Sequence, residues 1–309
     1  MAGTIDKQLN RIRAAYLAPN SYVELLKKEI PGIIDTAGNL VLSSRKAIEP
    51  VWCHNVWLNP QIVEFDSISE AAKKLKSLGR NWVMYPNREV RRGTLIAEQL
   101  PHLSLKPLRF PESPPKSPLG AFTLLNRNLI IASPLCSSPF PNGEVNFIES
   151  KTEPPSRAYL KLWEVFTLLG VKPGPKDRCL DAGACPGGWS WVLHSLKAKV
   201  LAIDRASLDP RIASLKGIEF MKGDALSLGP GDLGEFDWVF SDIICYPEQL
   251  YKWALKWVNS GKTKNIICTI KFQGNEHYDS VELFKKIPGS WLRHLSVNKH
   301  ELTWAWLNK

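Results

Sequence analysis

The stretch Asp181-Ala-Gly-Ala-Cys-Pro-Gly-Gly-Trp189 decides the fold of the second half of the chain. It begins at the end of a short apolar segment, residues 178–182, and runs into a helical pattern over residues 187–196. A glycine-rich turn between a buried strand and a helix lets a ligand approach the backbone closely at the carboxyl end of the strand. The turn lacks the GxGxxG spacing and the GK[ST] ending of phosphate-binding loops, so nucleotide phosphates are not the expected ligand.

Strand and helix patterns alternate from this turn onward. Such alternation predicts an α/β fold with a mostly parallel sheet and helices on both of its faces. Two apolar segments near the end of the chain, separated by a polar turn, predict an antiparallel hairpin at the edge of the sheet. The predicted strands are residues 178–182, 199–203, 218–221, 236–241, 265–270, 291–297 and 301–306, and the predicted helices are residues 187–196 and 247–258.

An acidic residue lies at or just after the end of each of the first four strands. After Asp181 come Asp204, Asp224 and Asp242. In an open α/β sheet, ligands bind at the carboxyl ends of the strands, and an acid after the second strand can accept both hydroxyls of a ribose. A single acid at such a place is as often a turn or capping residue, but four in order predict an adenosine site. Asp204 would hold the ribose, Asp224 the adenine amino group, and Asp242 would lie near the reactive group.

The length of 309 residues predicts about two domains. Segments rich in Pro and Ser at residues 111–118 and 137–144 predict loops near a domain boundary, and residues 121–131 predict a strand that closes the first domain. We expect residues 1–148 to form an α+β domain and residues 149–309 to form the second domain. Within the first we predict helices at residues 8–15, 21–28 and 69–78 and strands at residues 52–58 and 82–85.

The composition is that of a folded globular protein, with 44% hydrophobic and 23% charged residues. It excludes a disordered or fibrous chain. No apolar run approaches the roughly 18 to 20 residues that a membrane-spanning helix needs. The six cysteines show no CxxC spacing, and the first thirty residues lack the apolar core of a signal peptide. We therefore expect reduced thiols in the cytoplasm, with an organelle transit peptide as the alternative.

The charge balance predicts an anionic partner. The chain has 40 basic and 30 acidic residues, a net charge of +10, and the excess is shared between its two halves. Such a balance favours nucleic acid or another anionic surface. The cluster Lys73, Lys74 and Lys76 is either a solvated helix face or a contact to RNA phosphate. The twelve tryptophans are expected mainly in packing, with base stacking as the alternative.

The segment DAGACPGGWS, with Ser156-Arg-Ala-Tyr-Leu-Lys-Leu162 upstream, resembles the S-adenosylmethionine loop of the FtsJ/RrmJ class of RNA ribose 2′-O-methyltransferases. Within that class it is most similar to the RlmM family, which modifies a cytidine of large-subunit ribosomal RNA. The resemblance covers about residues 150–309. It implies a Rossmann-like methyltransferase domain, S-adenosylmethionine as cofactor, and RNA, most often ribosomal RNA, as partner. It also implies that the first half recognises RNA, as a THUMP-containing region does in that family.

The resemblance also implies roles for individual residues. The family has a catalytic Lys-Asp-Lys-Glu tetrad, and the matching positions here are Lys161, Asp242, Lys271 and Glu301. The chain departs from the family at Ala158, where a serine hydroxyl contacts the cofactor. Ser156 is a candidate substitute for that hydroxyl, and Arg157 is a candidate phosphate anchor. The implied cofactor residues are Cys185, Pro186, Gly187, Gly188, Trp189, Asp204, Asp224 and Asp242.

The tetrad suits methyl transfer to a ribose hydroxyl, because a positioned base can take the proton of this weak nucleophile as the new bond forms. We expect Lys271 to be the base. Burial beside the second cation, Lys161, would lower its pKa, whereas Asp242 and Glu301 would orient the two amines and oppose that lowering. The sequence leaves this balance open.

Covalent and metal-assisted chemistry are not expected. Cys185 has only His194 near it in the sequence, which is weak support for an activated thiol nucleophile. The histidines show no metal-binding spacing, so we predict no metal site. They are His54, His102, His194, His277, His294 and His300.

Two other functions remain open at this stage. One is a non-catalytic RNA-binding or ribosome-assembly protein that retains the fold; the intact tetrad argues against it. The other is an mRNA cap ribose methyltransferase. Cap recognition needs an aromatic sandwich, and the many tryptophans keep that alternative open.

Overall fold

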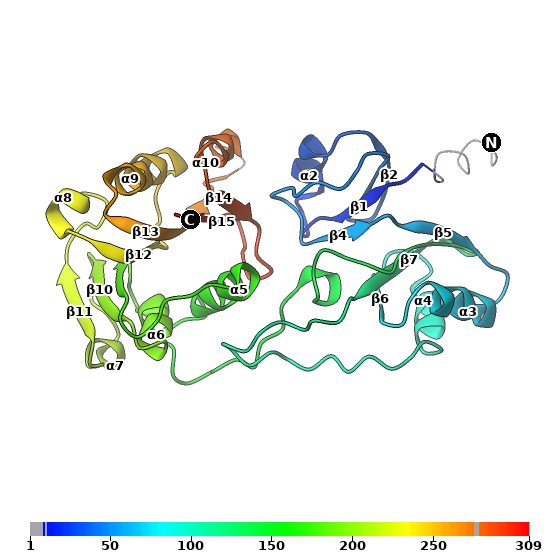
Figure 1. Cartoon of the computed structure of the whole chain (residues 1–309), viewed down its shortest axis with the longest axis horizontal. Helices are drawn as coiled ribbons and strands as arrows, with labels where there is room; N and C mark the ends of the chain where they lie inside the picture. Colours follow the sequence, from blue (N-terminus) through cyan, green and yellow to red (C-terminus); the bar gives the residue numbers. More distant parts are fainter. Residues whose placement is uncertain (1–8, 10, 275–277, 309) are drawn as a thin grey trace. The chain divides into compact units, whose positions relative to one another are not determined.

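The computed structural model describes residues 9, 11–274 and 278–308. The chain divides into two compact units, Met1–Phe147 and Ile148–Lys309 (Figure 1). The boundary lies next to Glu149, where the sequence places the start of the second domain. Each unit has its own sheets and helices.

A single seven-stranded sheet forms the centre of the second unit. Its first five strands are parallel, and β15 runs antiparallel between β13 and β14. The α/β fold class with a mostly parallel sheet is therefore confirmed. The strands, in spatial order, are β11 (Ile218–Lys222), β10 (Lys199–Asp204), β9 (Arg178–Ala182), β12 (Phe236–Ser241), β13 (Thr263–Lys271), β15 (Glu301–Leu307) and β14 (Ser290–Arg293).

The predicted hairpin at the end of the chain exists, but its second strand is not at the edge. Residues 301–306 of β15 are buried, and β15 pairs with β13 on one side and β14 on the other. The alternating sequence of this strand contains Trp304 and Trp306, whose large apolar rings favour an interior position. The start of β15 thus comes to lie beside the end of β13.

Helices cover both faces of this sheet. Figure 1 shows α5 (Tyr159–Leu169) and α6 (Gly188–Ser195) on one face, and α9 (Pro247–Ser260) and α10 (Val281–Lys285) on the other. Helix α5 is buried almost all around, and its charged residues are Lys161 and Glu164. Because burying a charge is costly unless it is paired, both side chains need partners inside the unit. Shorter helical turns are α7 (Pro210–Ala213), α8 (Pro230–Leu233) and η2 (Tyr278–Ser280).

Over residues 11–147, the first unit has two four-stranded sheets and three α-helices. One sheet has the order β2 (Ile33–Ala37), β3 (Leu40–Ser43), β1 (Ala14–Leu17) and β4 (Asn55–Leu58), with antiparallel pairs throughout. The other has the order β5 (Gln61–Glu64), β8 (Leu129–Ser133), β7 (Gly120–Asn126) and β6 (Trp82–Met84). The helices are α2 (Val23–Glu29), α3 (Ile68–Leu78) and α4 (Val90–Ala97), with a short turn, η1, at Pro141–Gly143.

Two predictions for the first unit are wrong. Ala14 and Ala15 of the predicted helix at residues 8–15 lie in β1, where pairing on both sides buries them completely; Gln8 lies outside the described residues. Sheet pairing here overrides the helix preference of alanine. The single strand predicted at residues 121–131 is a hairpin of β7 and β8. Its turn is fixed by Asn126, whose side chain accepts a hydrogen bond from the backbone N–H of Asn128 (2.9 Å).

Helix α3 begins where the sequence predicts. Ser67 caps it by accepting a hydrogen bond from the backbone N–H of Glu70 (3.2 Å). Lys73, Lys74 and Lys76 are exposed on this helix, and Lys74 pairs with Glu70 at 2.7 Å. Lys73 and Lys76 therefore add positive charge to the solvent-exposed face of the helix. None of the helices in the described residues has the length and apolarity to cross a bilayer.

Candidate active site

The predicted acids gather at one edge of the seven-stranded sheet. Asp181 lies in β9, Asp204 ends β10, Asp224 follows β11 and Asp242 follows β12. These four strands are parallel neighbours, so their carboxyl ends share an edge. The chain crosses from one side of β9 to the other between β11 and β12, which makes the end of β9 the switch point where such sheets bind ligands.

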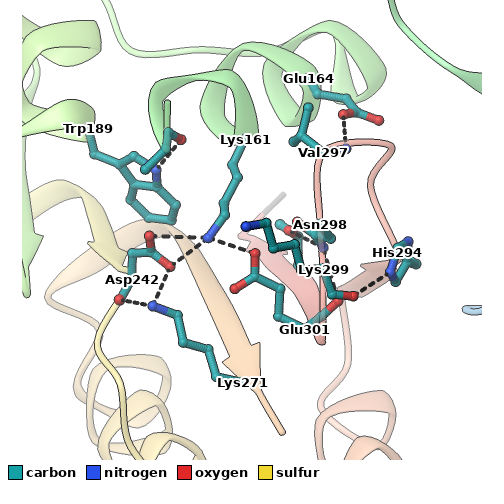
Figure 2. A network of polar contacts seen from close by, with 12 residues as sticks. Lys161, Glu164, Trp189, Asp242, Lys271, His294, Val297, Asn298, Lys299 and Glu301 are labelled. Atoms are coloured by element: carbon teal, nitrogen blue, oxygen red, sulfur yellow. Dashed lines mark hydrogen bonds and ion pairs between the residues drawn. The ribbon is translucent and has the colours of Figure 1, made fainter. Parts of the chain in front are cut away.

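The structure brings Lys161, Asp242, Lys271 and Glu301 together at this edge (Figure 2). The ammonium group of Lys161 lies 3.1 Å from Asp242 Oδ1 and 2.8 Å from Glu301 Oε1. Lys271 Nζ lies 3.0 Å from Asp242 Oδ1 and donates a hydrogen bond to the main-chain oxygen of Asp242 at 2.6 Å. The four side chains come from α5, from the loop after β12, and from β13 and β15.

The strand register explains why Glu301 joins the group. Lys271, the last residue of β13, is the direct cross-strand partner of Glu301, the first residue of β15. An antiparallel strand presents its beginning, rather than its end, at the edge where the parallel strands finish. The insertion of β15 into the sheet is therefore what supplies the fourth member of the cluster.

The cluster is shielded from solvent. Its four side chains are between 11% and 20% exposed, and it brings together two lysines and two acidic residues. Burial lowers the pKa of Lys161, but Asp242 and Glu301 raise it by more, so that this pKa lies above its ordinary value. The two acidic side chains therefore favour the charged form of Lys161.

Hydrogen bonds hold the glycine-rich turn against the end of β10. The backbone N–H of Cys185 donates to Asp204 Oδ2 (2.9 Å), and the main-chain oxygen of Pro186 accepts from the N–H of Asp209 (3.0 Å). The other oxygen of Asp204 accepts from the N–H of Ala206 (2.9 Å). Asp204 therefore shapes the loop, and a carboxylate with these two bonds still has free lone pairs for a ligand hydroxyl.

Two glycines in this turn have no room for a side chain. Gly187 has φ of 113°, and a Cβ there would lie 2.8 Å from Ile212 Cγ2. A Cβ on Gly188 would lie 2.6 Å from Ser156 Oγ. The turn therefore packs Gly187 against α7 and Gly188 against the segment before α5, and both positions favour glycine because of this close approach.

Trp189 and Cys185 do not present reactive groups. Trp189, predicted to contact the cofactor, is buried, and its indole N–H donates to the main-chain oxygen of Ala158 (2.9 Å). Its ring edge packs against Phe240, so the structure gives it a packing role. Burial, followed by the nearby charge of Asp204, raises the pKa of the Cys185 thiol. This disfavours the thiolate that a cysteine nucleophile needs.

Asp224 has a charged partner that sequence reasoning missed. Arg205, directly after Asp204, contacts Asp224 Oδ2 at 2.6 Å. The hydrogen bond from Arg205 is the main cause that lowers the pKa of Asp224. The predicted ribose and adenine residues are thus linked through one arginine across β10 and β11. The immediate succession of Asp204 and Arg205 was the available signal in the sequence.

Two buried oxygen atoms near the turn have no hydrogen-bond partner within the described part of the chain: Ser156 Oγ and Asp181 Oδ1. The other oxygen of Asp181 accepts from Ser190 Oγ at 2.6 Å, and burial raises the pKa of this carboxyl to about 7. By contrast, a Cβ on Gly223 would meet no atom within 4 Å.

The segment before α5 has its own features. Ala158, where the family has a serine, contributes its main-chain oxygen to Trp189, as described above. Arg157, the candidate phosphate anchor, pairs with Glu149 at 2.8 Å while its side chain is 77% exposed. A cavity of about 550 Å³ opens along this segment. Its lining residues include Lys151, Ser156, Arg157 and Tyr159.

Glu164 is a further functional candidate that the sequence analysis missed. Figure 2 shows it on α5 beside the loop that contains Val297. Burial raises its pKa to about 7, although the Ser296 backbone and hydroxyl groups, the Val297 N–H and the charge of Arg293 lower it. Its only signal in the sequence is its position three residues after Lys161 in an otherwise apolar helix.

Among the described residues, no cluster of three or more His, Cys, Asp or Glu side chains could hold a metal ion. His277 lies outside the described residues. His294 is buried, and its Nε2 lies 3.1 Å from the main-chain oxygen of Lys299.

Comparisons with known proteins bear on this site. Residues 154–287 match the model of the FtsJ-like methyltransferase family. Over 226 residues the chain is 28% identical to the ribosomal RNA large subunit methyltransferase M of Xanthomonas oryzae pv. oryzae (strain MAFF 311018). That match covers 70% of this chain and 60% of the relative, so the chain spans less than two thirds of the relative's length.

Similar solved structures include a putative hemolysin from Lactococcus lactis, at 16% identity and a TM-score of 0.43, covering 52% of this chain and 90% of that one. Another is a putative ribosomal RNA methyltransferase from Plasmodium falciparum, at 17% identity and a TM-score of 0.37, covering 50% of this chain and 97% of that one. The family match, which begins just before α5 and ends after α10, confirms the resemblance predicted from the sequence: over residues 154–287 this chain is similar to the FtsJ-like methyltransferases, and its relatives include the RlmM proteins.

Proposed function

We propose that this chain is an S-adenosylmethionine-dependent methyltransferase that acts on a ribose 2′-hydroxyl of RNA, with ribosomal RNA as the substrate. One observation carries the proposal: two lysines and two carboxylates meet in a shielded cluster at the carboxyl edge of the sheet, beside the glycine-rich turn. The resemblance to the FtsJ-like family implies that these four residues correspond to its catalytic tetrad; the family match over residues 154–287 includes Lys161, Asp242 and Lys271, and Glu301 follows it. Their assignment as catalytic residues is part of this proposal.

The residues around the turn suit the proposed methyl donor. When bound, S-adenosylmethionine supplies an electrophilic methyl group on a sulfonium. Asp204 has carboxylate lone pairs left for ribose hydroxyls, and Gly223 leaves open space next to Asp224. The Ser156 hydroxyl lies beside Gly188 and has no partner among the described residues, which supports Ser156 as the substitute for the serine missing at Ala158. Cys185, Pro186, Gly187 and Gly188 would form the backbone wall of this site.

The two lysines have different roles in this proposal. Lys161 stays charged, because Asp242 and Glu301 raise its pKa. Lys271 contacts only Asp242 in the cluster, through one side-chain oxygen and the main-chain oxygen. A neutral amine still has two N–H groups for these two contacts, and its lone pair remains to accept the proton of the ribose hydroxyl. Asp242 would orient this lone pair, while Lys161 keeps the two carboxylates from repelling one another.

The first unit serves as the RNA-recognition module in this proposal, in the place that a THUMP-containing region has in the RlmM family. The net charge of +10, shared between both halves, supports an extended polyanion as partner. The target nucleotide has to leave its stack, because the 2′-hydroxyl must reach a partly buried cluster. The six free thiols agree with a cytoplasmic setting.

The test uses the purified chain, radiolabelled S-adenosylmethionine, and total RNA from cells that lack this protein. We expect label in ribosomal RNA at a position that resists alkaline cleavage, since a 2′-O-methyl group removes the nucleophile of that reaction. Replacing Lys271→Ala should lower turnover by about 10² to 10⁴-fold, the usual range for loss of a general base. Its affinity for S-adenosylmethionine should stay within a few-fold by calorimetry.

Lys264→Ala is the matched control, because Lys264 lies on the same strand, pairs with Asp237 at 2.6 Å and is 72% exposed. It should keep full turnover. Turnover in Lys271→Ala that equals that of the unmodified chain would overturn the base assignment. Donor binding by the unmodified chain without label in any RNA would overturn the proposed substrate, and label only in capped mRNA would replace it.

A further inference from the structure

Glu164 is a buried carboxylate that the proposed reaction does not use. Its side chain accepts three hydrogen bonds from the loop between β14 and β15. Ser296 N donates to Oε1 at 2.7 Å, while Ser296 Oγ and Val297 N donate to Oε2 at 2.7 Å and 3.3 Å. The residue is only 1% exposed, so these groups replace the water that a carboxylate would otherwise bind. A carboxylate with three donors at one loop is a strong local anchor.

Helix geometry places this anchor next to the tetrad. Lys161 and Glu164 are three residues apart on α5, and side chains at that spacing lie on the same face of a helix. Lys161 reaches forward to Glu301 at the start of β15, and Glu164 holds the loop that leads into β15 (Figure 2). Helix α5 therefore contacts residues 296–301 at two points. One is Glu301 in the tetrad, and the other is Ser296 outside it.

The loop is built to carry a displacement from Ser296 to Glu301. Asn298 follows the anchored residues, and its side-chain Nδ2 donates to the main-chain oxygen of Glu301 (3.2 Å) and to Thr303 Oγ1 (3.3 Å). Its backbone N–H donates back to Leu295 (3.1 Å). These bonds tie the loop to the first residues of β15. A displacement of the loop at Ser296 and Val297 should therefore also displace Glu301.

We propose that Glu164 is a positioning residue of the methyltransferase site, which fixes the distance between Glu301 and Lys161 by anchoring the loop at Ser296 and Val297. The proposal rests on the proposed function for its effect on turnover. Its structural part, the coupling between residues 164 and 301, stands independently of which reaction the tetrad performs.

A graded series of variants tests the anchor. Ser296→Ala removes one of the three hydrogen bonds. Glu164→Gln keeps the shape but turns an N–H group toward the donor of Val297, and Glu164→Ala removes all three bonds. We expect kcat to fall in that order, by about 2-fold, about 10-fold and about 100-fold, while the KM for S-adenosylmethionine stays within a few-fold. Small displacements of catalytic groups are known to have effects of this size.

The control is Thr167→Val on the same helix. Thr167 is buried, but its hydroxyl donates to Trp163 within α5 and not to the loop. This variant should lose stability without losing kcat per folded molecule. Equal kcat values in Glu164→Gln and Thr167→Val, at matched folded fractions, would overturn the positioning role.

A second measurement needs no activity. Melting temperatures are compared for Glu164→Gln, Glu301→Gln and the double variant, and for the same cycle built with Thr167→Val. We expect the Glu164 cycle to depart from additivity by at least about 2 °C, and the Thr167 cycle to be additive. Additive behaviour in both cycles would overturn the inference. Non-additive stability in a chain that methylates no RNA would retain the inference and refute the proposed function instead.

Discussion

Removing Lys161 should expose how the tetrad is held together. In Lys161→Met, Asp242 and Glu301 lose the ammonium group that both of them contact, at 3.1 Å and 2.8 Å. Their oxygens therefore lie no more than about 6 Å apart, without the ammonium group that bridges them. At an effective dielectric constant of about 20, two unit charges at that distance repel by about 3 kcal/mol. Loss of a buried pairing partner has measured costs of about 3 to 5 kcal/mol.

We therefore expect Lys161→Met to lower the free energy of unfolding of the second unit by about 3 to 5 kcal/mol at pH 7.5. Urea unfolding followed by tryptophan fluorescence measures this value. The double variant Lys161→Met with Glu301→Gln removes the repulsion, so it should recover about 3 kcal/mol of the loss. Neither variant should transfer methyl groups, which separates the folding role of Lys161 from its role in the reaction.

An exposed pair provides the control for this measurement. Lys264 and Asp237 are only 2.6 Å apart, but the Lys264 side chain is 72% exposed. Lys264→Met should therefore cost no more than about 1 kcal/mol, as is usual for surface ion pairs. If Lys161→Met is as stable as Lys264→Met, or if the added Glu301→Gln brings no recovery, the buried charge balance is not what stabilises the cluster.

Two further outcomes follow from the site and its supporting loop. Asp204→Ala should weaken S-adenosylmethionine binding by about 1.5 to 3 kcal/mol, as expected for loss of hydrogen bonds to a charged group, and unchanged affinity by calorimetry would contradict the adenosine-site assignment. Burial lowers the pKa of His294 to about 4 from an ordinary 6.5, so protonation of the unfolded chain should remove about 3 kcal/mol of stability as pH falls through that range. His294→Gln does not titrate, so its unfolding free energy should fall by about 2 kcal/mol less than that of the unchanged chain between pH 7 and pH 4.5; equal losses would show that this histidine is accessible to protons when folded.

The second unit could be predicted from its sequence because local pattern and global fold agree there. The strands around Asp181, Asp204 and Asp242 are short apolar runs that end in acids, and each ends at the same edge of the sheet. Local patterning is enough to find such elements. The approach of Lys161 and Glu301 to that edge was implied by the family resemblance and not by periodicity, since their partners lie far away in the chain.

What the sequence could not give depends on long-range pairing. The segment containing Ala14 and Ala15 becomes a strand because β3 and β4 pair with it on both sides. The residues of the segment itself do not indicate that these strands will pair with it. Likewise, Glu164 looks like one acid in an apolar helix until the loop of Ser296 is placed against it. Tertiary context decided both outcomes.

Asp242 contacts two lysines at once: its side chain contacts both, and its main-chain oxygen also accepts a hydrogen bond from Lys271. Once the Asp242 side chain is replaced, a later change at either lysine has fewer contacts to remove, because Lys161 keeps only Glu301 and Lys271 keeps only the main-chain oxygen of residue 242 within the cluster. Mutational effects within the group should therefore show strong epistasis, in which the first loss is severe and later losses are mild. In a lineage where natural selection on the tetrad is relaxed, the four residues are expected to be lost together. A chain that keeps all four is therefore expected to have been under selection for the tetrad until recently.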